Sequence, residues 1–135
     1  MTISPPLLFR ALADRTRLRI VNLLARGPLC VCDIQRILEQ PQSSVSRHLA
    51  LLKAAGLIAD RRDGMRTFYR LTSWESGLAR GVLASIRGHL AVEGDYLSDL
   101  EELTELRARG ECHEEPKSQR RRPSTSRRGA AVLEA

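Results

Sequence analysis

The sequence predicts a mainly α-helical domain that carries one small β-hairpin. Three observations predict this fold class: apolar residues recur at helical spacing in four short segments before residue 56, an Asp-Gly pair at 63–64 separates two β-prone runs, and a helical pattern resumes after Ser73. The chain has 135 residues, of which 42% are hydrophobic and 4% aromatic, so it can build one modest core. A multidomain enzyme is therefore excluded.

Four short helices are expected in the first part of the chain. They cover, in order, residues 7–12, 16–25, 31–40 and 43–55. Asp14 is a good N-cap for the second helix, and Gly27 ends it. Pro41 stops the third and Gly56 the fourth. Because only residues 40–42 separate the last two helices, they are expected to pack closely across a tight turn.

A hairpin is predicted next, from residues 57–62 and 65–71 on either side of Asp63-Gly64. A two-residue turn at this pair would place Arg61 opposite Arg66. Like charges directly across a ladder repel, which favours two arginines that straddle a DNA phosphate. Two alternatives stay open: both arginines point into water, or the register slips by one residue and they are no longer paired.

The rest of the chain divides into a helical part and a tail. Helix is expected from Ser73 to about Arg109, with a break near Gly94. A seam of apolar residues runs along it and, with the first helix, offers a dimer surface; it comprises Leu83, Ile86, Leu90, Leu97 and Leu100. The expected organisation is a DNA-binding and dimerisation domain at 1–92, a helical extension at 93–110 and a disordered basic tail at 111–135.

The basic charge is concentrated in the first half of the chain. Residues 1–72 contain 12 basic and 5 acidic side chains, whereas residues 73–109 contain 4 and 7. This asymmetry indicates a face that binds a polyanion. No run approaches the roughly 18 apolar residues of a membrane span, and no secretory signal is evident, so we expect a cytoplasmic protein without a membrane partner.

The order helix, helix, tight turn, helix, hairpin, helix is that of a winged helix-turn-helix. Three segments resemble the arsenical-resistance repressors of the ArsR/SmtB family: residues 29–34 (LCVCDI), 40–52 (QPQSSVSRHLALL) and 55–58 (AGLI). The resemblance covers about residues 7–90. It implies a homodimeric repressor of operator DNA that needs no cofactor to bind DNA, and an inducer that is trivalent arsenic or antimony, As(III) or Sb(III).

The helix expected over 43–55 has the pattern of a DNA-recognition helix. At 100° per residue its apolar positions form one stripe, and short hydroxyls with one arginine form the opposite face. Such a face can enter the major groove, where arginine grips guanine. The candidate DNA-binding residues of this helix and of the hairpin are Ser43, Ser44, Ser46, Arg47, His48, Arg61, Arg62 and Arg66. His48 lies near the core boundary, so a packing role is equally open.

Cys30 and Cys32 are the candidate metal ligands. Cys32 points away from the apolar stripe of its helix, Cys30 lies just outside the helix, and a helix N-terminus favours thiolates. We interpret both as free thiols or metal ligands. Side chains two apart in a helix point about 200° from each other, so one ion would hold both sulfurs only by distorting the first turn. Because the next helix reads DNA, that distortion would release DNA.

The sequence leaves the identity of a third ligand open. Gln35 stands where longer versions of the family motif carry another cysteine. Cys112 is a possible third ligand, expected to be mobile and dispensable. His89 and Glu93 lie where zinc-sensing relatives place ligands, but a solvent-exposed histidine is the better interpretation.

Other functions stay open from the sequence. The same fold could respond to thiol oxidation or to other soft metals. A thiol reductase is disfavoured because no Cys-x-x-Cys or βαβ pattern accompanies the pair. A constitutive nucleic-acid packaging protein would show neither sequence preference nor a response to thiophilic ligands.

Overall fold

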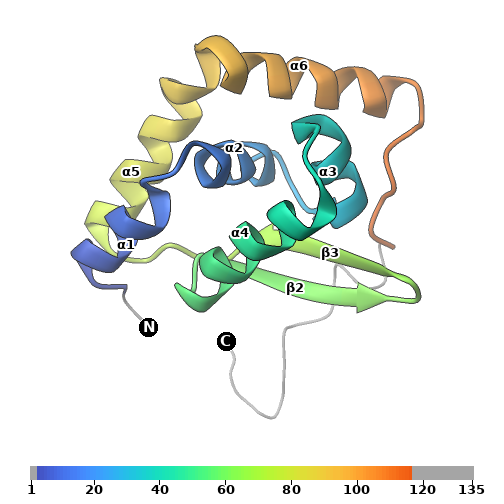
Figure 1. Ribbon diagram of the computed structural model, residues 1–135. Helices are drawn as coiled ribbons and strands as arrows, with labels where there is room; N and C mark the ends of the chain where they lie inside the picture. The colour runs from blue at the N-terminus through green and yellow to red at the C-terminus, as the bar shows by residue number, and fades with distance from the viewer. Residues whose placement is uncertain (1–2, 117–135) are drawn as a thin grey trace.

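The computed structural model describes residues 3–116, and within them six α-helices and three strands form a winged helix-turn-helix (Figure 1). The bounds are α1 Pro5–Leu12, α2 Arg15–Leu24, β1 Leu29–Cys30, α3 Val31–Leu38, α4 Gln42–Ala54, β2 Ile58–Asp63, β3 Arg66–Leu71, α5 Gly77–Gly88, the 3-10 turn η1 Leu90–Val92, and α6 Gly94–Ala108. The expected fold class is confirmed. In this part of the chain, no helix has the length and apolar character that crossing a bilayer requires.

Local capping sets the ends of α1 to α4 within two residues of the expected ones, whereas α5 begins at Gly77 rather than at the expected Ser73. Asp14 caps α2 by accepting a hydrogen bond from the backbone N–H of Arg17 at 3.0 Å. Glu39 ends α3 in the left-handed conformation, at φ 55°, earlier than the expected stop at residue 40. The recognition helix α4 then starts after Pro41, whose fixed φ suits an N-cap position.

The sheet differs from the predicted hairpin in two ways. Its order is β1-β3-β2, because the two-residue strand β1, which ends at Cys30, pairs with β3. The turn is Gly64-Met65 rather than Asp63-Gly64, so Asp63 pairs with Arg66 and Arg61 pairs with Phe68. The predicted Arg61–Arg66 pairing is wrong, and with it the repulsion argument. Gly64 has φ 62°, which a glycine adopts without strain at the first turn position, and opposite charges now face each other.

The last helix belongs to the core rather than to an extension. The break before it lies at Gly94, as expected, with φ 40°. Arg19 of α2 donates two hydrogen bonds to the Asp99 carboxylate, both at 2.8 Å, and these bonds raise the pKa of Arg19. Leu103 and Leu106 are buried in the same apolar cluster as the helix-turn-helix. Figure 1 shows α6 lying across α2 and α3.

The chain after α6 is not the start of a tail, because residues 111–116 pack back on the domain. They descend beside α3 toward the hairpin (Figure 1). Glu111 accepts hydrogen bonds from Arg36 at 2.7 Å and from Arg109 at 3.1 Å, and these bonds lower the pKa of its carboxyl. The prediction of a disordered tail from residue 111 is therefore wrong for residues 111–116. The rest of the predicted tail, 117–135, lies outside the described residues. We call residues 111–116 the C-terminal segment.

Candidate thiol site and nucleic-acid interface

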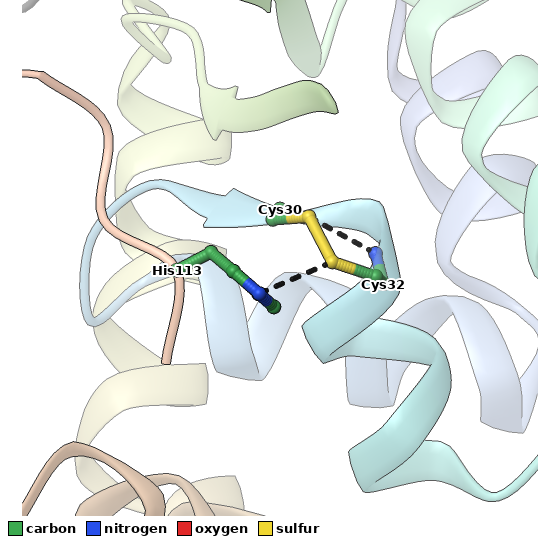
Figure 2. Close-up of side chains that lie close together, drawn as sticks. All are labelled: Cys30, Cys32 and His113. Atoms are coloured by element: carbon green, nitrogen blue, oxygen red, sulfur yellow. Dashed lines mark hydrogen bonds between the residues drawn. A yellow bond between two sulfur atoms is a disulfide. The ribbon is translucent and has the colours of Figure 1, made fainter. Parts of the chain in front are cut away.

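Cys30 and Cys32 meet at the junction between β1 and α3 (Figure 2). Cys30 is fully buried and is the N-cap of α3, with an extended backbone at φ −69° and ψ 144°. Its sulfur accepts a hydrogen bond from the backbone N–H of Cys32 at 3.2 Å. Cys32 is the second helical residue and is half-buried. The cap geometry therefore turns both sulfurs toward one another.

This geometry corrects two expectations. The two sulfurs are joined as a disulfide, so Cys30 and Cys32 are not free thiols in this structure. The first turn of α3 also needs no distortion to bring them together, since the helix runs unbroken from Val31 to Leu38. The 200° separation assumed in the prediction applies only when both residues are helical, and Cys30 is extended.

A histidine and a buried aspartate, both missed by the sequence reasoning, complete this site. His113 comes from the C-terminal segment, and its Nδ1 lies 3.4 Å from Cys32 Sγ (Figure 2). Asp33 is 1% exposed; its carboxylate accepts the backbone N–H of His113 at 2.8 Å and lies 3.1 Å from His113 Nδ1. Among residues 3–116, Cys30, Cys32 and His113 form the one group of three potential metal ligands. Nothing in the sequence links positions 80 residues apart.

Cys112 does not lie with the pair. Its side chain packs against the apolar core and is absent from the three-ligand group among the described residues. Burial raises the pKa of the Cys112 thiol, and the nearby Asp33 carboxylate raises it further. A protonated, packed thiol is a poor soft-ion ligand. His89 is the C-cap of α5 and Glu93 is the N-cap of α6; both are exposed, and neither belongs to the three-ligand group found among the described residues.

The exposed face of α4 matches the predicted recognition face. Val45, Leu49 and Leu52 are buried, and on the opposite side Ser43, Ser46 and Arg47 are exposed. Ser44 is half-buried; its hydroxyl donates to Gln40 Oε1 at 3.2 Å, in the turn before the helix. The three exposed residues thus have side chains directed away from the core.

His48 has a structural partner. Arg17 Nη1 lies 3.2 Å from His48 Nδ1, and because arginine only donates, this ring nitrogen is the acceptor. Arg17 also donates to the carbonyl of Ala11 at 2.6 Å and to that of Arg10 at 3.3 Å. The guanidinium therefore joins the end of α1 to α4. Of the two roles left open for His48, the structure supports the packing contact.

The three hairpin arginines have different surroundings. Arg66 is exposed, next to the turn. Arg62 is also exposed, and its Nε donates to the carbonyl of Gly64 at 3.4 Å. Arg61 is instead largely covered, with 16% of its side chain exposed and its Nε 3.6 Å from the buried carboxylate of Glu115. Arg66 and Arg62 are thus the better placed to reach a phosphate.

The thiol site and the recognition face belong to two helices that share one core. Ile34, Ile37 and Leu38 of α3 lie in the same cluster as the buried side of α4. The connecting turn is fixed by Gln40, whose Nε2 donates to Thr16 Oγ1 at 3.1 Å. A change at the start of α3 therefore has a packed route to α4.

An apolar groove lies between α1 and α5. It has a volume of about 640 Å³ and is lined by apolar side chains of both helices, including Phe9, Leu78, Val82 and Ile86. Phe9 is 51% exposed and Leu78 44% exposed. The expected dimer surface, formed by the first helix and the apolar seam after Ser73, includes residues of this groove such as Ile86 and Leu90.

The chain is similar in sequence to known bacterial regulators, in agreement with its winged helix-turn-helix fold. Residues 14–60 match the bacterial regulatory protein arsR family. Over 105 residues the chain is 39% identical to the "Arsenic resistance transcriptional regulator ArsR1" of Pseudomonas putida, which covers 74% of this chain and 82% of the relative. It is 54% identical over 71 residues to the "Arsenical resistance operon repressor" of Escherichia coli, covering 52% and 61% respectively. These relatives are regulators, not enzymes.

Solved structures of two bacterial proteins also resemble this fold. Reduced HlyU from Vibrio cholerae superposes with a TM-score of 0.56 at 30% identity, covering 64% of this chain and 87% of that one. The repressor BigR from Xylella fastidiosa gives 0.55 at 30% identity, covering 64% and 84%.

Proposed function

Because this chain belongs to the arsR family of bacterial regulatory proteins, we propose that it is a cytoplasmic transcriptional repressor that binds operator DNA as a dimer. Trivalent arsenic or antimony would bind the Cys30 and Cys32 thiolates and release the DNA. The observation that carries the proposal is the meeting of the two sulfurs at the N-terminus of α3, the helix that packs on α4.

The thiol pair fits a thiophilic inducer once it is reduced. Sulfur ligands select soft ions, and the positive end of the α3 dipole favours two thiolates at this position. Cys30 already lies in the extended conformation that turns its sulfur toward Cys32. A reducing cytoplasm would keep both thiols available.

The DNA side of the proposal rests on the exposed face of α4. Arg47 reaches out from it beside Ser43 and Ser46, none of which is needed to fill the core. Arginine recognises guanine through two hydrogen bonds, and hydroxyls contact bases or phosphates. Arg62 and Arg66 of the hairpin would add contacts to the backbone.

Release follows if the ligand and the DNA prefer different arrangements of α3 and α4. The two helices share a buried core, so a shift at the thiol end changes the position of the recognition face. By linkage, a ligand that favours the shifted arrangement weakens DNA binding by the same coupling free energy.

Dimerisation is proposed through α1 and α5. A single winged helix buries too little DNA for tight specific binding. The groove between these helices is apolar, and Phe9 at its edge is half exposed, which a second copy would cover.

A second candidate is a repressor that responds to thiol oxidation, and the Cys30–Cys32 disulfide favours it. Here a peroxide would accept two electrons and two protons from the thiols and be reduced to water and an alcohol or a second water, while the sulfur–sulfur bond forms. The DNA would then be bound by one redox state and released by the other.

One titration separates the candidates. A duplex selected by the protein from a randomised library is labelled, and its fluorescence anisotropy is followed while arsenite, antimonite or hydrogen peroxide is added to reduced protein at fixed salt. Release by arsenite without oxidant supports the metalloid sensor. Release by peroxide alone, reversed by a phosphine reductant, supports the redox switch, and no release by any of them contradicts both.

A further inference from the structure

We propose that His113 is the third donor of the thiol site, so that reduced Cys30 and Cys32 bind a divalent cation of the zinc class together with the His113 imidazole. The inference rests on the proposed function in treating the two cysteines as ligand-binding thiolates. It adds a nitrogen donor from the C-terminal segment, and with it a different class of ion.

The spacing of the donors fits such a site. Zinc bonds of about 2.3 Å to sulfur and 2.0–2.1 Å to nitrogen, at a tetrahedral angle, place the two atoms roughly 3.5 Å apart. In the structure Cys32 Sγ and His113 Nδ1 are 3.4 Å apart, and all three donor atoms lie within 4.8 Å of one another. Figure 2 shows the imidazole pointing at the sulfur pair. Reduction would let the sulfurs separate to tetrahedral spacing.

Asp33 holds the histidine in place independently of any ion. Its buried carboxylate accepts the His113 backbone N–H at 2.8 Å, and this bond does not involve the ring nitrogen that would ligate. The same carboxylate lies 3.1 Å from Nδ1, so a ligating Nδ1 would exchange this contact for the bond to the ion. The buried charge of Asp33 would also lie close to the cation.

The segment that carries His113 is anchored on both sides. Glu111 is bound by Arg36 of α3, and Glu115 is buried 3.6 Å from Arg61 of β2. Recruiting an unstructured residue costs conformational entropy, and here the fold has already fixed the neighbours. Gln35 stands where longer versions of the family motif carry another cysteine, so α3 supplies no further sulfur donor.

The donor set separates two kinds of ligand. Imidazole suits zinc and similar divalent ions, whereas trivalent arsenic selects sulfur. His113 should therefore be required for zinc-class binding but not for arsenite, which can take its third sulfur from a small thiol in solution. The same sulfur pair would then bind two classes of ligand: zinc-class cations together with His113, and arsenite without it.

The test uses the reduced, metal-free full chain. Co²⁺ serves as the probe, because its absorption bands report tetrahedral geometry and the number of thiolates, and Zn²⁺ is then titrated in competition. We expect His113→Ala to weaken both ions at least about tenfold, the lower range for disturbed zinc ligation. His89→Ala removes an exposed imidazole elsewhere and should change neither affinity. His113→Cys should restore the Co²⁺ bands with an added thiolate component and strengthen arsenite binding without glutathione.

Equal Co²⁺ affinity and spectra for wild type and His113→Ala would overturn the inference, as would the absence of Co²⁺ and Zn²⁺ binding by the wild-type protein. Either result leaves arsenite-dependent DNA release to be judged separately. Conversely, loss of arsenite response with intact His113-dependent Co²⁺ binding would contradict the proposed inducer and support this site. Circular dichroism of each variant verifies that the fold is intact.

Discussion

The start of α3 and the exposed face of α4 lie in one helix-turn-helix, but the side chains of the first are bonded within the protein and those of the second are exposed to solvent. At the start of α3, Cys30 bonds to Cys32, and Asp33 binds His113. On α4, Ser43 and Arg47 extend into solvent. The first region is assembled by contacts within the fold, whereas the side chains of the second make their contacts with solvent. We infer that the difference separates a preformed ligand site from a surface that is completed only by DNA.

Cys32→Ser should have the largest effect, and only on the preformed region. The hydroxyl is a poor soft-ion ligand, so arsenite should release DNA only at roughly 100-fold higher concentration or not at all. DNA affinity itself should stay within about twofold, because Cys32 is half-buried and far from the exposed side of α4. Anisotropy titrations with and without arsenite measure both quantities.

Cys30→Ser is the matched variant. Serine is a good N-cap, so its hydroxyl can replace the sulfur that accepts the Cys32 N–H and keep α3 folded. A full arsenite response in either variant would remove that cysteine from the site.

Arg47→Ala should affect only the second region. Removal of one base-contacting arginine is expected to weaken operator binding by about 1–3 kcal/mol and relax base preference, with no change in the free energy of unfolding. Arg87→Ala on α5 removes the same charge from another exposed helix and is the control. If both variants bind DNA equally well, the face of α4 is not the reading surface.

Arg66→Ala should have a smaller effect, spread evenly over all DNA sequences. Loss of one phosphate contact lowers the slope of log affinity against log salt by about one. Arg61→Ala should change that slope less, since this side chain faces Glu115. Salt titrations of the two variants decide, and a larger change for Arg61 would show that the Glu115 contact opens on DNA.

Cys112→Ser should have the smallest effect, less than about twofold on arsenite-dependent release. Burial raises the pKa of this thiol, so at neutral pH it holds its proton more firmly in the folded chain than in the unfolded one. Alkylation by iodoacetamide should accordingly be slower in the native protein and accelerate only at higher pH. A tenfold loss of arsenite response, with or without glutathione, would instead establish Cys112 as a ligand.

Sequence reasoning anticipated the regions governed by local rules. Helical periodicity predicts Val45, Leu49 and Leu52 as the buried stripe of α4, and the low helix propensity of glycine predicts the break near Gly94. These features depend on residues close in the chain. The observed hairpin register differs from the predicted one by two residues. A shift of two leaves each side chain on the same face of the sheet, so the hydrophobic pattern cannot distinguish the two registers.

The thiol site was only half predictable. The motif at 29–34 identified Cys30 and Cys32, but their meeting depends on an extended cap at Cys30 rather than on helix geometry. His113 reaches them because the chain reverses after α6 and Asp33 binds its backbone. Neither the reversal nor that hydrogen bond has a periodic or compositional signal, so the C-terminal segment was read as the beginning of a tail.

In the proposed mechanism the thiol pair and the α4 face are linked through α3, and such linkage is reciprocal. Its most direct test is the arsenite affinity of the reduced protein measured twice, free and saturated with its selected duplex. Linkage predicts weaker arsenite binding to the DNA complex, by the same factor that arsenite weakens DNA binding, in the range of about 5–150-fold. Equal arsenite affinity in the two states, with Cys30 and Cys32 both engaged, would contradict it.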